Sequence, residues 1–128
     1  MIIAIDFDGT IVEHDYPRIG KPVPLAIETM ISLQQSGNQL ILYTMRSGKE
    51  LQDAVDYCKE RGVEFWAVNK NPSQWKWTKS PKVYAQVYID DAALGCPLLG
   101  QKFEVRPHVD WAEVRKYFRM GDEFWNQK

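Results

Sequence analysis

The chain has 128 residues, of which 45% are hydrophobic and 26% are charged, and its formal net charge is -1 at pH 7. This composition is typical of a folded domain and excludes a disordered chain, so residues 1–128 are predicted to form a single domain. The charge balance gives no electrostatic reason to expect an anionic membrane or a nucleic-acid backbone as the main partner, so nucleic acid enters only as a substrate.

Cysteine usage and hydropathy indicate where the chain resides. Cys58 and Cys96 are too few for a disulfide framework and lack metal-type spacing, so they are predicted to be reduced thiols. No apolar run approaches the roughly 20 residues of a bilayer-spanning helix, and no basic segment precedes the first run. The sequence therefore predicts a cytoplasmic protein that does not enter a membrane.

The first 44 residues read as strand, loop, helix and strand. Residues 2–7 are apolar except for Asp6, which is typical of a strand covered on both faces in a parallel sheet. Residues 13–24 are rich in turn formers and predict a loop, after which a helix should run from Pro24 to about Ser36. QLILYT, at residues 39–44, predicts a second buried strand.

The later segments continue the alternation of helix and strand. Ser47 and Glu50 have the spacing of a capping box, which predicts a second amphipathic helix as far as about Arg61. FWAV predicts a short third strand, and residues 69–81 form an irregular excursion at or above the sheet edge. QVYID predicts a further strand, residues 103–105 are another candidate strand, and Asp110 and Glu113 predict the start of a last helix.

This alternation predicts an α/β fold with a doubly wound, mainly parallel sheet, whose ligand crevice lies beyond the carboxyl ends of the strands. Polar residues follow three of the predicted strands at that edge. They are Asp6, Asp8, Gly9 and Thr10 after the first strand, Thr44, Met45 and Arg46 after the second, and Asp90 and Asp91 after QVYID, with Lys82 shortly before it.

Up to four carboxylates in one crevice repel one another and would take up protons unless a cation lies among them. Oxygen ligands suit Mg²⁺, which usually takes one or two carboxylates and a substrate phosphate, whereas His14 and His108 form no zinc-like pair. The pattern therefore predicts Mg²⁺ and a phosphorylated substrate. Thr44, Lys82 and backbone N–H groups such as that of Met45 are candidates for binding the other phosphate oxygens.

These residues match the motifs of a known family. DFDGT at residues 6–10, the apolar strand ending in Thr44, Lys82, and the pair Asp90 and Asp91 resemble, in this order, the four motifs of the haloacid dehalogenase-like (HAD) phosphohydrolase superfamily. The resemblance covers about residues 2–91 and implies a HAD-like Rossmannoid fold and phosphatase activity.

The resemblance also implies roles for individual residues. Asp6 would be the nucleophile that forms an aspartyl-phosphate, and Asp8 would protonate the leaving group and then activate water. Mg²⁺ would be held by the Asp6 side chain, the Asp8 backbone carbonyl and Asp90, with Asp91 as a further ligand or as a residue that orients the site.

Family members that enclose small metabolites carry a cap domain in one of two places. Here about 13 residues separate Thr10 from the first predicted helix, and a similar number separate Asn69 from Lys82. Neither segment is long enough to fold as a domain, so a capless (C0-type) member is expected. An open site suits a large substrate, or a small one closed off by short loops or by a neighbouring subunit in a homo-oligomer.

Three other features are candidate substrate contacts. Trp75 and Trp77 alternate with lysines and could stack on a base or sugar, although packing over the sheet edge or at an oligomer contact is the favoured interpretation. Arg46 is a candidate because it lies at the carboxyl end of the second predicted strand. His14, Tyr16 and Arg18, on the first loop, are also possible substrate contacts but are more simply explained as part of the loop surface.

Two other functions remain alternatives to a Mg²⁺-dependent phosphomonoesterase. A receiver-like signalling domain uses an aspartyl-phosphate as a signal, but its first strand supplies the acidic pair and a later strand the phosphorylated aspartate, whereas D-x-D comes first here. A non-catalytic binding protein on the same fold would work through the Trp-rich loop. The presence of all four acidic residues argues against a non-catalytic protein, because acids without a role would only destabilise the site.

Overall fold

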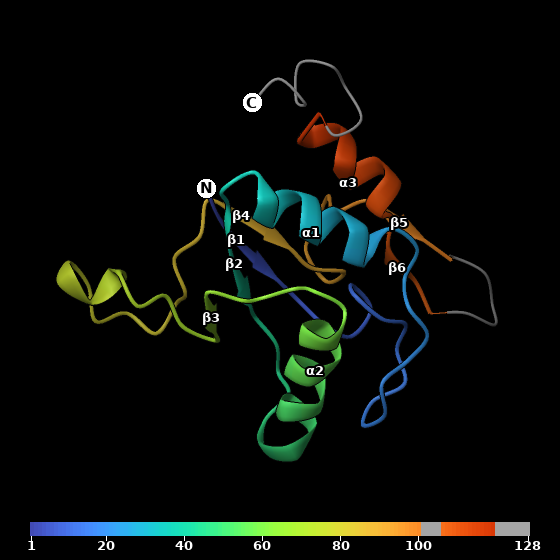
Figure 1. The fold of residues 1–128 in the computed structure, drawn as a ribbon, viewed down its shortest axis with the longest axis horizontal. Coiled ribbons are helices and arrows are strands. Elements are labelled where there is room, and N and C mark those ends of the chain that lie inside the picture. Colours follow the sequence, from blue (N-terminus) through green and yellow to red (C-terminus); the bar gives the residue numbers. More distant parts are fainter. Residues whose placement is uncertain (101–105, 120–128) are drawn as a thin grey trace.

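The computed structural model describes residues 1–100 and 106–119. Within these residues the chain forms an α/β fold with a four-stranded parallel sheet, in the order β3-β2-β1-β4, and a two-stranded antiparallel sheet, β5-β6 (Figure 1). The predicted α/β fold with a mainly parallel sheet is confirmed. The elements are β1 (Ile2–Ile5), α1 (Ala26–Gln35), β2 (Gln39–Leu42), α2 (Gly48–Glu60), β3 (Ala67–Val68), the 3-10 helix η1 (Gln74–Lys76), β4 (Val87–Ile89), β5 (Leu98–Leu99), β6 (His108–Val109) and α3 (Trp111–Tyr117).

Strand β1 lies inside the sheet, between β2 and β4, which is why its sequence is an unbroken apolar run. Its pairing with β4 places Ile5 opposite Ile89. The ladder continues one residue further, because the Asp6 N–H donates to the Ile89 carbonyl at 2.9 Å. The first residues after β1 and β4 are therefore held side by side.

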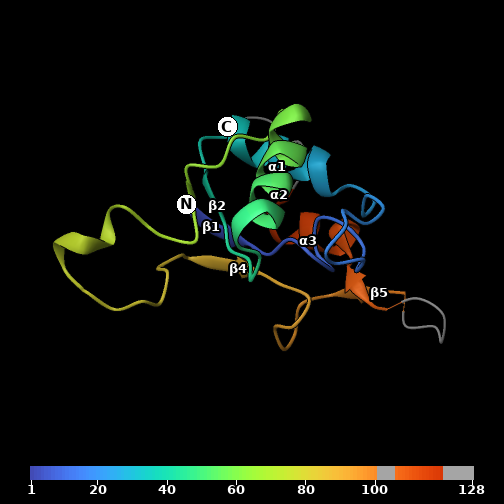
Figure 2. The same cartoon turned by 90° about the horizontal axis from the view of Figure 1, so that it is seen from below.

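The three described α-helices pack on one face of the parallel sheet. Met30 of α1, Cys58 of α2 and Trp111 of α3 share one hydrophobic core with the strand residues Ile3 and Ile5. Figure 2 shows α1 and α2 on the same side of β4. Because side chains alternate along a strand, every second strand residue points to the opposite face, away from the helices.

The opposite face carries a second, smaller cluster. Ile41 and Ala67 of the sheet are buried there against Val83, with Ile2 and Trp66 partly buried around them. Val83 belongs to the long segment that connects β3 to β4. This segment, residues 69–86, is called the arm below, and it extends away from the body of the protein (Figures 1 and 2).

Two buried amide side chains hold the arm in one conformation. Gln74, which is 2% exposed, donates to the carbonyls of Ser80 and Lys82 at 3.0 Å and accepts from the Tyr84 N–H at 2.8 Å. Asn71 is fully buried and donates to the Tyr84 carbonyl at 2.8 Å. The predicted excursion is thus an ordered loop stabilised by its own side chains.

The predicted N-terminal caps of the helices are confirmed for α3 but not for α2. The Asp110 carboxylate accepts from the Glu113 N–H at 3.3 Å and caps α3, as predicted. The predicted capping box of α2 is wrong in detail, because the Ser47 hydroxyl makes no capping hydrogen bond. Gly48, the first residue of α2, has a φ of 56°, so the first turn departs from regular helical geometry.

The C-terminal part of the chain supports the turn that follows β1. The Val109 N–H of β6 donates to the Gly9 carbonyl at 2.9 Å, and the Trp111 indole Nε1–H donates to the Thr10 carbonyl at 2.7 Å. The short sheet β5-β6 was not expected from the sequence. The candidate strand at residues 103–105 lies outside the described residues.

Two predictions on sequence composition can be compared with the structure. Cys58 and Cys96 are both free thiols, as predicted, and Cys58 is buried. Among the described residues, no helix combines the length and the continuous apolar sequence that crossing a bilayer requires.

The Trp111 hydrogen bond predicts a measurable loss of stability when its donor is removed. Trp111 is fully buried, so Trp111→Phe leaves the Thr10 carbonyl without a partner and should lower the free energy of unfolding by about 1–3 kcal/mol. Urea denaturation measures this difference. Tyr117→Phe on the same helix is the control, because Tyr117 is 76% exposed and its substitution should change little. Equal effects of the two substitutions would contradict the role of the bond.

Candidate functional site

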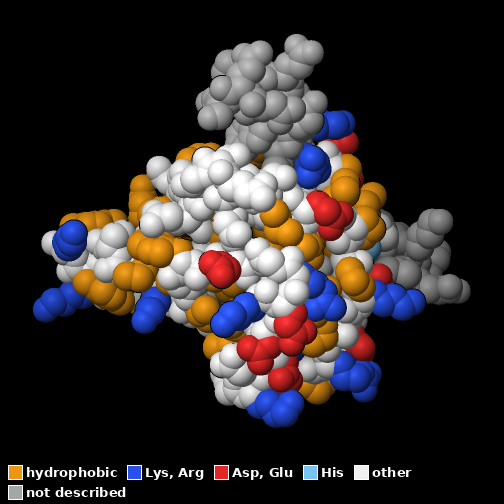
Figure 3. All heavy atoms as spheres, viewed as in Figure 1, with side chains coloured by type: hydrophobic (Ala, Val, Ile, Leu, Met, Phe, Trp, Pro, Cys, Tyr) orange, Lys and Arg blue, Asp and Glu red, His pale blue; other side chains and the backbone are white. Residues whose placement is uncertain are grey.

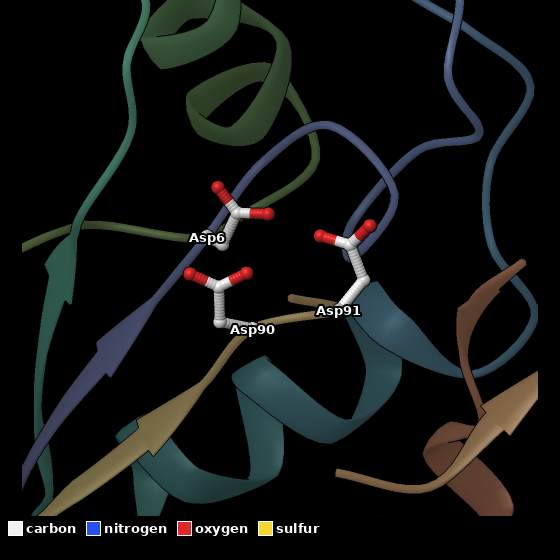
Figure 4. Close-up of side chains that lie close together, drawn as sticks. All are labelled: Asp6, Asp90 and Asp91. Carbon is white, nitrogen blue, oxygen red and sulfur yellow. The ribbon is translucent and has the colours of Figure 1, made fainter. Parts of the chain in front are cut away.

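Three carboxylates meet at the carboxyl ends of β1 and β4. Asp6 follows β1, whereas Asp90 and Asp91 follow β4, and Figure 4 shows their side chains close together. Each offers a carboxylate oxygen, and these oxygens all lie within 4.8 Å of one another. Such a set of oxygen atoms fits a hard divalent cation, so these residues could hold a metal.

Burial and mutual repulsion disfavour the charged forms of these acids. Burial, together with the negative charge of Asp90 and a hydrogen bond with Asp91, raises the pKa of Asp6 to about 8. Burial also raises the pKa of Asp90, and the charge of Asp91 adds to this effect. The cluster is therefore suited to hold either protons or a cation.

The Thr10 hydroxyl links the two strand ends. It donates to Asp6 Oδ2 at 3.0 Å and accepts from the Asp91 N–H at 3.2 Å. The first of these bonds favours the ionised form of Asp6 and opposes the rise of its pKa. Thr10 is fully buried, so this hydroxyl has a structural role in the site as well as in the turn.

Gly9 provides space for a contact between His14 of the first loop and Asp91, which follows β4. His14 Nε2 lies 2.8 Å from Asp91 Oδ2, with both side chains largely buried. A Cβ atom on residue 9 would overlap the His14 ring and the Asp91 carboxylate, and Gly9 has a φ of 80°. Sequence reasoning gave His14 no specific role, because its partner lies 77 residues away along the chain.

Asp8 lies in a different environment from Asp6. Its two carboxylate oxygens accept from Arg46 Nε and Nη2, both at 2.8 Å, and the Arg46 side chain is 1% exposed. Arg46 also donates to the carbonyls of Pro17, Arg18 and Glu50 at 3.1, 2.6 and 3.3 Å. The Asp8 side chain is therefore held by a guanidinium group and does not belong to the cluster of three acids.

Aromatic rings complete the environment of Arg46. Its guanidinium carbon lies 4.9 Å from the centre of the Phe7 ring and 5.2 Å from that of Tyr16. The hydrogen bond with Asp8 is the main cause that raises the pKa of Arg46. Sequence reasoning placed Arg46 among the candidate substrate contacts and missed its pairing with Asp8, which depends on two loops meeting in space.

Of the other residues that follow β2, Thr44 is partly buried and Met45 is exposed. The Thr44 N–H donates to Asn69 Oδ1 at 2.8 Å, and the Thr44 hydroxyl accepts from the Arg46 N–H at 3.1 Å. Met45 is 98% exposed. These contacts fix the backbone beside Arg46 and leave the Met45 side chain in solvent.

The arm carries the other predicted residues. Lys82 is exposed, and its Nζ lies 5.8 Å from the centre of the Tyr88 ring. Within residues 1–100 and 106–119, no hydrogen bond or ion pair joins Lys82 to the three acids. Trp75 and Trp77 are 55% and 65% exposed, so packing over the sheet edge does not bury them.

The comparisons with known proteins include a solved structure that is similar to this chain. No protein-family model and no curated protein matches the chain. A solved structure, described as that of a conserved protein coded by a locus from Bacteroides thetaiotaomicron, is 41% identical to this chain. The match covers 97% of this chain and 93% of that one, with a TM-score of 0.76. The two chains are thus similar in sequence and fold over nearly their whole length.

The raised pKa of Asp6 predicts that stability falls as the pH rises. Between the ordinary pKa of 3.8 and the folded pKa of about 8, the unfolded chain is ionised while the folded protein keeps its proton. The free energy of unfolding should therefore decrease by up to about 1.4 kcal/mol per pH unit in this range. Asp6→Asn removes this titration and should gain stability over the wild type from about pH 4 to about pH 8. Chemical denaturation in EDTA across this range measures how the free energy of unfolding changes with pH in the two proteins. Equal slopes would contradict the raised pKa of Asp6.

The Arg46 contacts predict that even a conservative substitution is costly. Lysine keeps the charge but cannot bind both Asp8 oxygens and the three carbonyls, so Arg46→Lys should lower the free energy of unfolding by about 2–4 kcal/mol. Arg18→Lys is the matched control, because the Arg18 pair with Asp15 is exposed and contributes little. Chemical denaturation compares the two variants. A stable Arg46→Lys protein would show that the buried pair is dispensable.

Proposed function

We propose that this chain, which belongs to the same family as the conserved Bacteroides thetaiotaomicron protein, is a Mg²⁺-dependent phosphomonoester hydrolase of HAD-like type. The observation that carries the proposal is the meeting of Asp6, Asp90 and Asp91 at the ends of adjacent parallel strands. A crevice beyond the carboxyl ends of such strands is where α/β proteins bind ligands. The proposed reaction passes through an aspartyl-phosphate on Asp6.

The topology supports a HAD-like Rossmannoid fold without a cap domain. The chain runs from β1 through β2 to β3 in one direction and returns to the other side of β1 as β4, so the winding direction reverses beside Asp6. In the proposed doubly wound arrangement, the arm takes the place of helices on the second face of the sheet. The first loop and the arm are the two places where a cap would be inserted, and neither is long enough to fold as a domain.

The donor set supports a magnesium site. Asp6, Asp90 and Asp91 would hold the ion through carboxylate oxygens, and the resemblance adds the backbone carbonyl of Asp8. When bound, Mg²⁺ would offset the repulsion among these acids and the negative charge of the phosphoryl oxygens.

The protein's own residues then divide the chemistry between them. An Asp6 oxygen attacks phosphorus and forms a new P–O bond while the bond to the leaving oxygen breaks, and water later cleaves the aspartyl-phosphate to release phosphate. Thr10 orients the Asp6 carboxylate through Oδ2. Asp8 would give a proton to the leaving oxygen and later take one from water. Since both Asp8 oxygens accept from Arg46, one of these bonds must open for that transfer.

The phosphoryl oxygens need further donors. We propose that the Thr44 hydroxyl, the Met45 N–H and the Lys82 ammonium group supply them. Met45 and Lys82 are exposed in the described conformation and are therefore accessible to a ligand.

The nucleophile assignment predicts the effects of two substitutions. In a panel of sugar phosphates, nucleotides and phosphopeptides with Mg²⁺, Asp6→Asn should abolish phosphate release and Asp8→Asn should lower kcat by about 10²- to 10⁴-fold. EDTA should stop the wild-type reaction and added Mg²⁺ should restore it. Asp56→Asn on α2 is the control, because Asp56 is exposed, lies outside the site and accepts a hydrogen bond from the neighbouring Gln52 side chain.

Two outcomes would contradict the proposal. Wild-type rates in Asp6→Asn would exclude Asp6 as the nucleophile. A stable phosphoprotein that releases no phosphate would favour the receiver-like alternative instead.

A further inference from the structure

The second face of the sheet carries a hollow lined by aromatic rings. Its volume is about 350 Å³, and Trp77, Lys82, Tyr84 and Tyr88 contribute its principal side chains. We call the pocket that these four residues line the aromatic hollow. Trp77 and Tyr84 come from the arm, whereas Tyr88 comes from β4, so the hollow lies where the arm returns to the sheet.

The rings of the hollow are held in place before any ligand binds. The Tyr88 hydroxyl accepts from the Ala85 N–H at 3.2 Å and donates to the Val83 carbonyl at 2.5 Å. Trp77 and Tyr84 meet edge to face, with ring centres 5.6 Å apart. Gln74 fixes the backbone of Lys82 and Tyr84 from beneath. A preorganised aromatic surface of this kind binds flat rings without a large loss of side-chain entropy.

The charge around the hollow favours an anionic ligand. Residues 65–89 contain four lysines and no aspartate or glutamate. The Lys82 ammonium group lies within cation–π distance of Tyr88, so it stands at the rim of the aromatic surface. Two copies of this chain joined through the hollow would bring their two Lys82 charges together. A second copy is therefore a poor occupant, whereas a flat ring attached to a phosphate is complementary in both charge and shape.

The position of the hollow connects it to the three acids. Tyr88 and Asp90 are two residues apart along β4 and its extension, so their side chains point to the same face about 6.6 Å apart along the strand. Asp6 lies beside Asp90. A nucleoside can bridge this separation with its base in the hollow and its phosphate at Asp6.

We infer that the aromatic hollow binds the base of a mononucleotide whose phosphate reaches Asp6. This inference rests on the proposed function and names its substrate class: phosphate monoesters with a planar heteroaromatic group. The volume lies at the lower end of small-molecule sites and holds one base with its ribose.

Equilibrium binding tests the inference without turnover. All titrations use Asp6→Asn protein with Mg²⁺, so that the ligands stay intact. Adenosine 5′-monophosphate should bind at least about tenfold more tightly than ribose 5-phosphate, which has the same sugar and phosphate but no base. Adding Trp77→Ala should weaken binding of the nucleotide about 5- to 150-fold. Trp75→Ala is the matched control, since Trp75 is on the same arm, is exposed and does not line the hollow.

Three outcomes would overturn the inference. The first is equal affinity for the nucleotide and ribose 5-phosphate, and the second is an equal loss in the Trp75→Ala control. The third is a dimer, detected by sedimentation in the ultracentrifuge, that Trp77→Ala converts to a monomer. This result would identify the hollow as a subunit interface. Failure of the proposed function would appear separately, as absence of phosphate release from every ester by the wild-type protein.

Discussion

Electrostatic repulsion among three carboxylates is the constraint on which the rest of the structure depends. Parallel pairing of β1 with β4 brings Asp6 and Asp90 side by side, and burial there makes their charges unfavourable. The surrounding structure compensates with specific contacts, since Thr10 donates to Asp6 and His14 pairs with Asp91. The C-terminal elements β6 and α3 hold the turn that carries Thr10. A site that costs stability is thus maintained by parts of the chain far apart in sequence.

Asp6 and Asp8 are two residues apart but lie in opposite electrostatic environments. Asp6 faces two other acids, whereas both oxygens of Asp8 face the buried guanidinium of Arg46. The turn at Gly9 makes this possible, because it reverses the chain immediately after the strand and leaves room for the His14 contact with Asp91. Two carboxylates of one motif can therefore have different chemical roles, as a nucleophile and a proton-transfer group require.

Features encoded locally could be predicted from the sequence, and features that depend on distant contacts could not. The apolar run of β1, the amphipathic pattern of α2 and the Asp110 cap each depend on residues within one element, and the structure contains all three. The alternation of strands and helices predicts parallel strands whose carboxyl ends share one edge of the sheet, so the gathering of Asp6 and Asp90 at that edge could also be anticipated. The partners of Asp8 and Asp91 could not, because Arg46 and His14 lie 38 and 77 residues away from them. The β5-β6 pair has too few residues to show a pattern of its own.

The uneven covering of the sheet connects the fold to the choice of ligand. Parallel sheets usually have helices on both faces, yet the three described α-helices pack on one face only. On the other face the arm buries Ile41 and Ala67 with Val83 but leaves Tyr88 37% exposed. A helix at this position would cover Tyr88 and block the approach to Asp90 along that face. By using an ordered loop held by Gln74, the chain buries its second core and keeps an aromatic surface open beside the acids. In the proposed function, this surface would bind the part of the substrate that does not react.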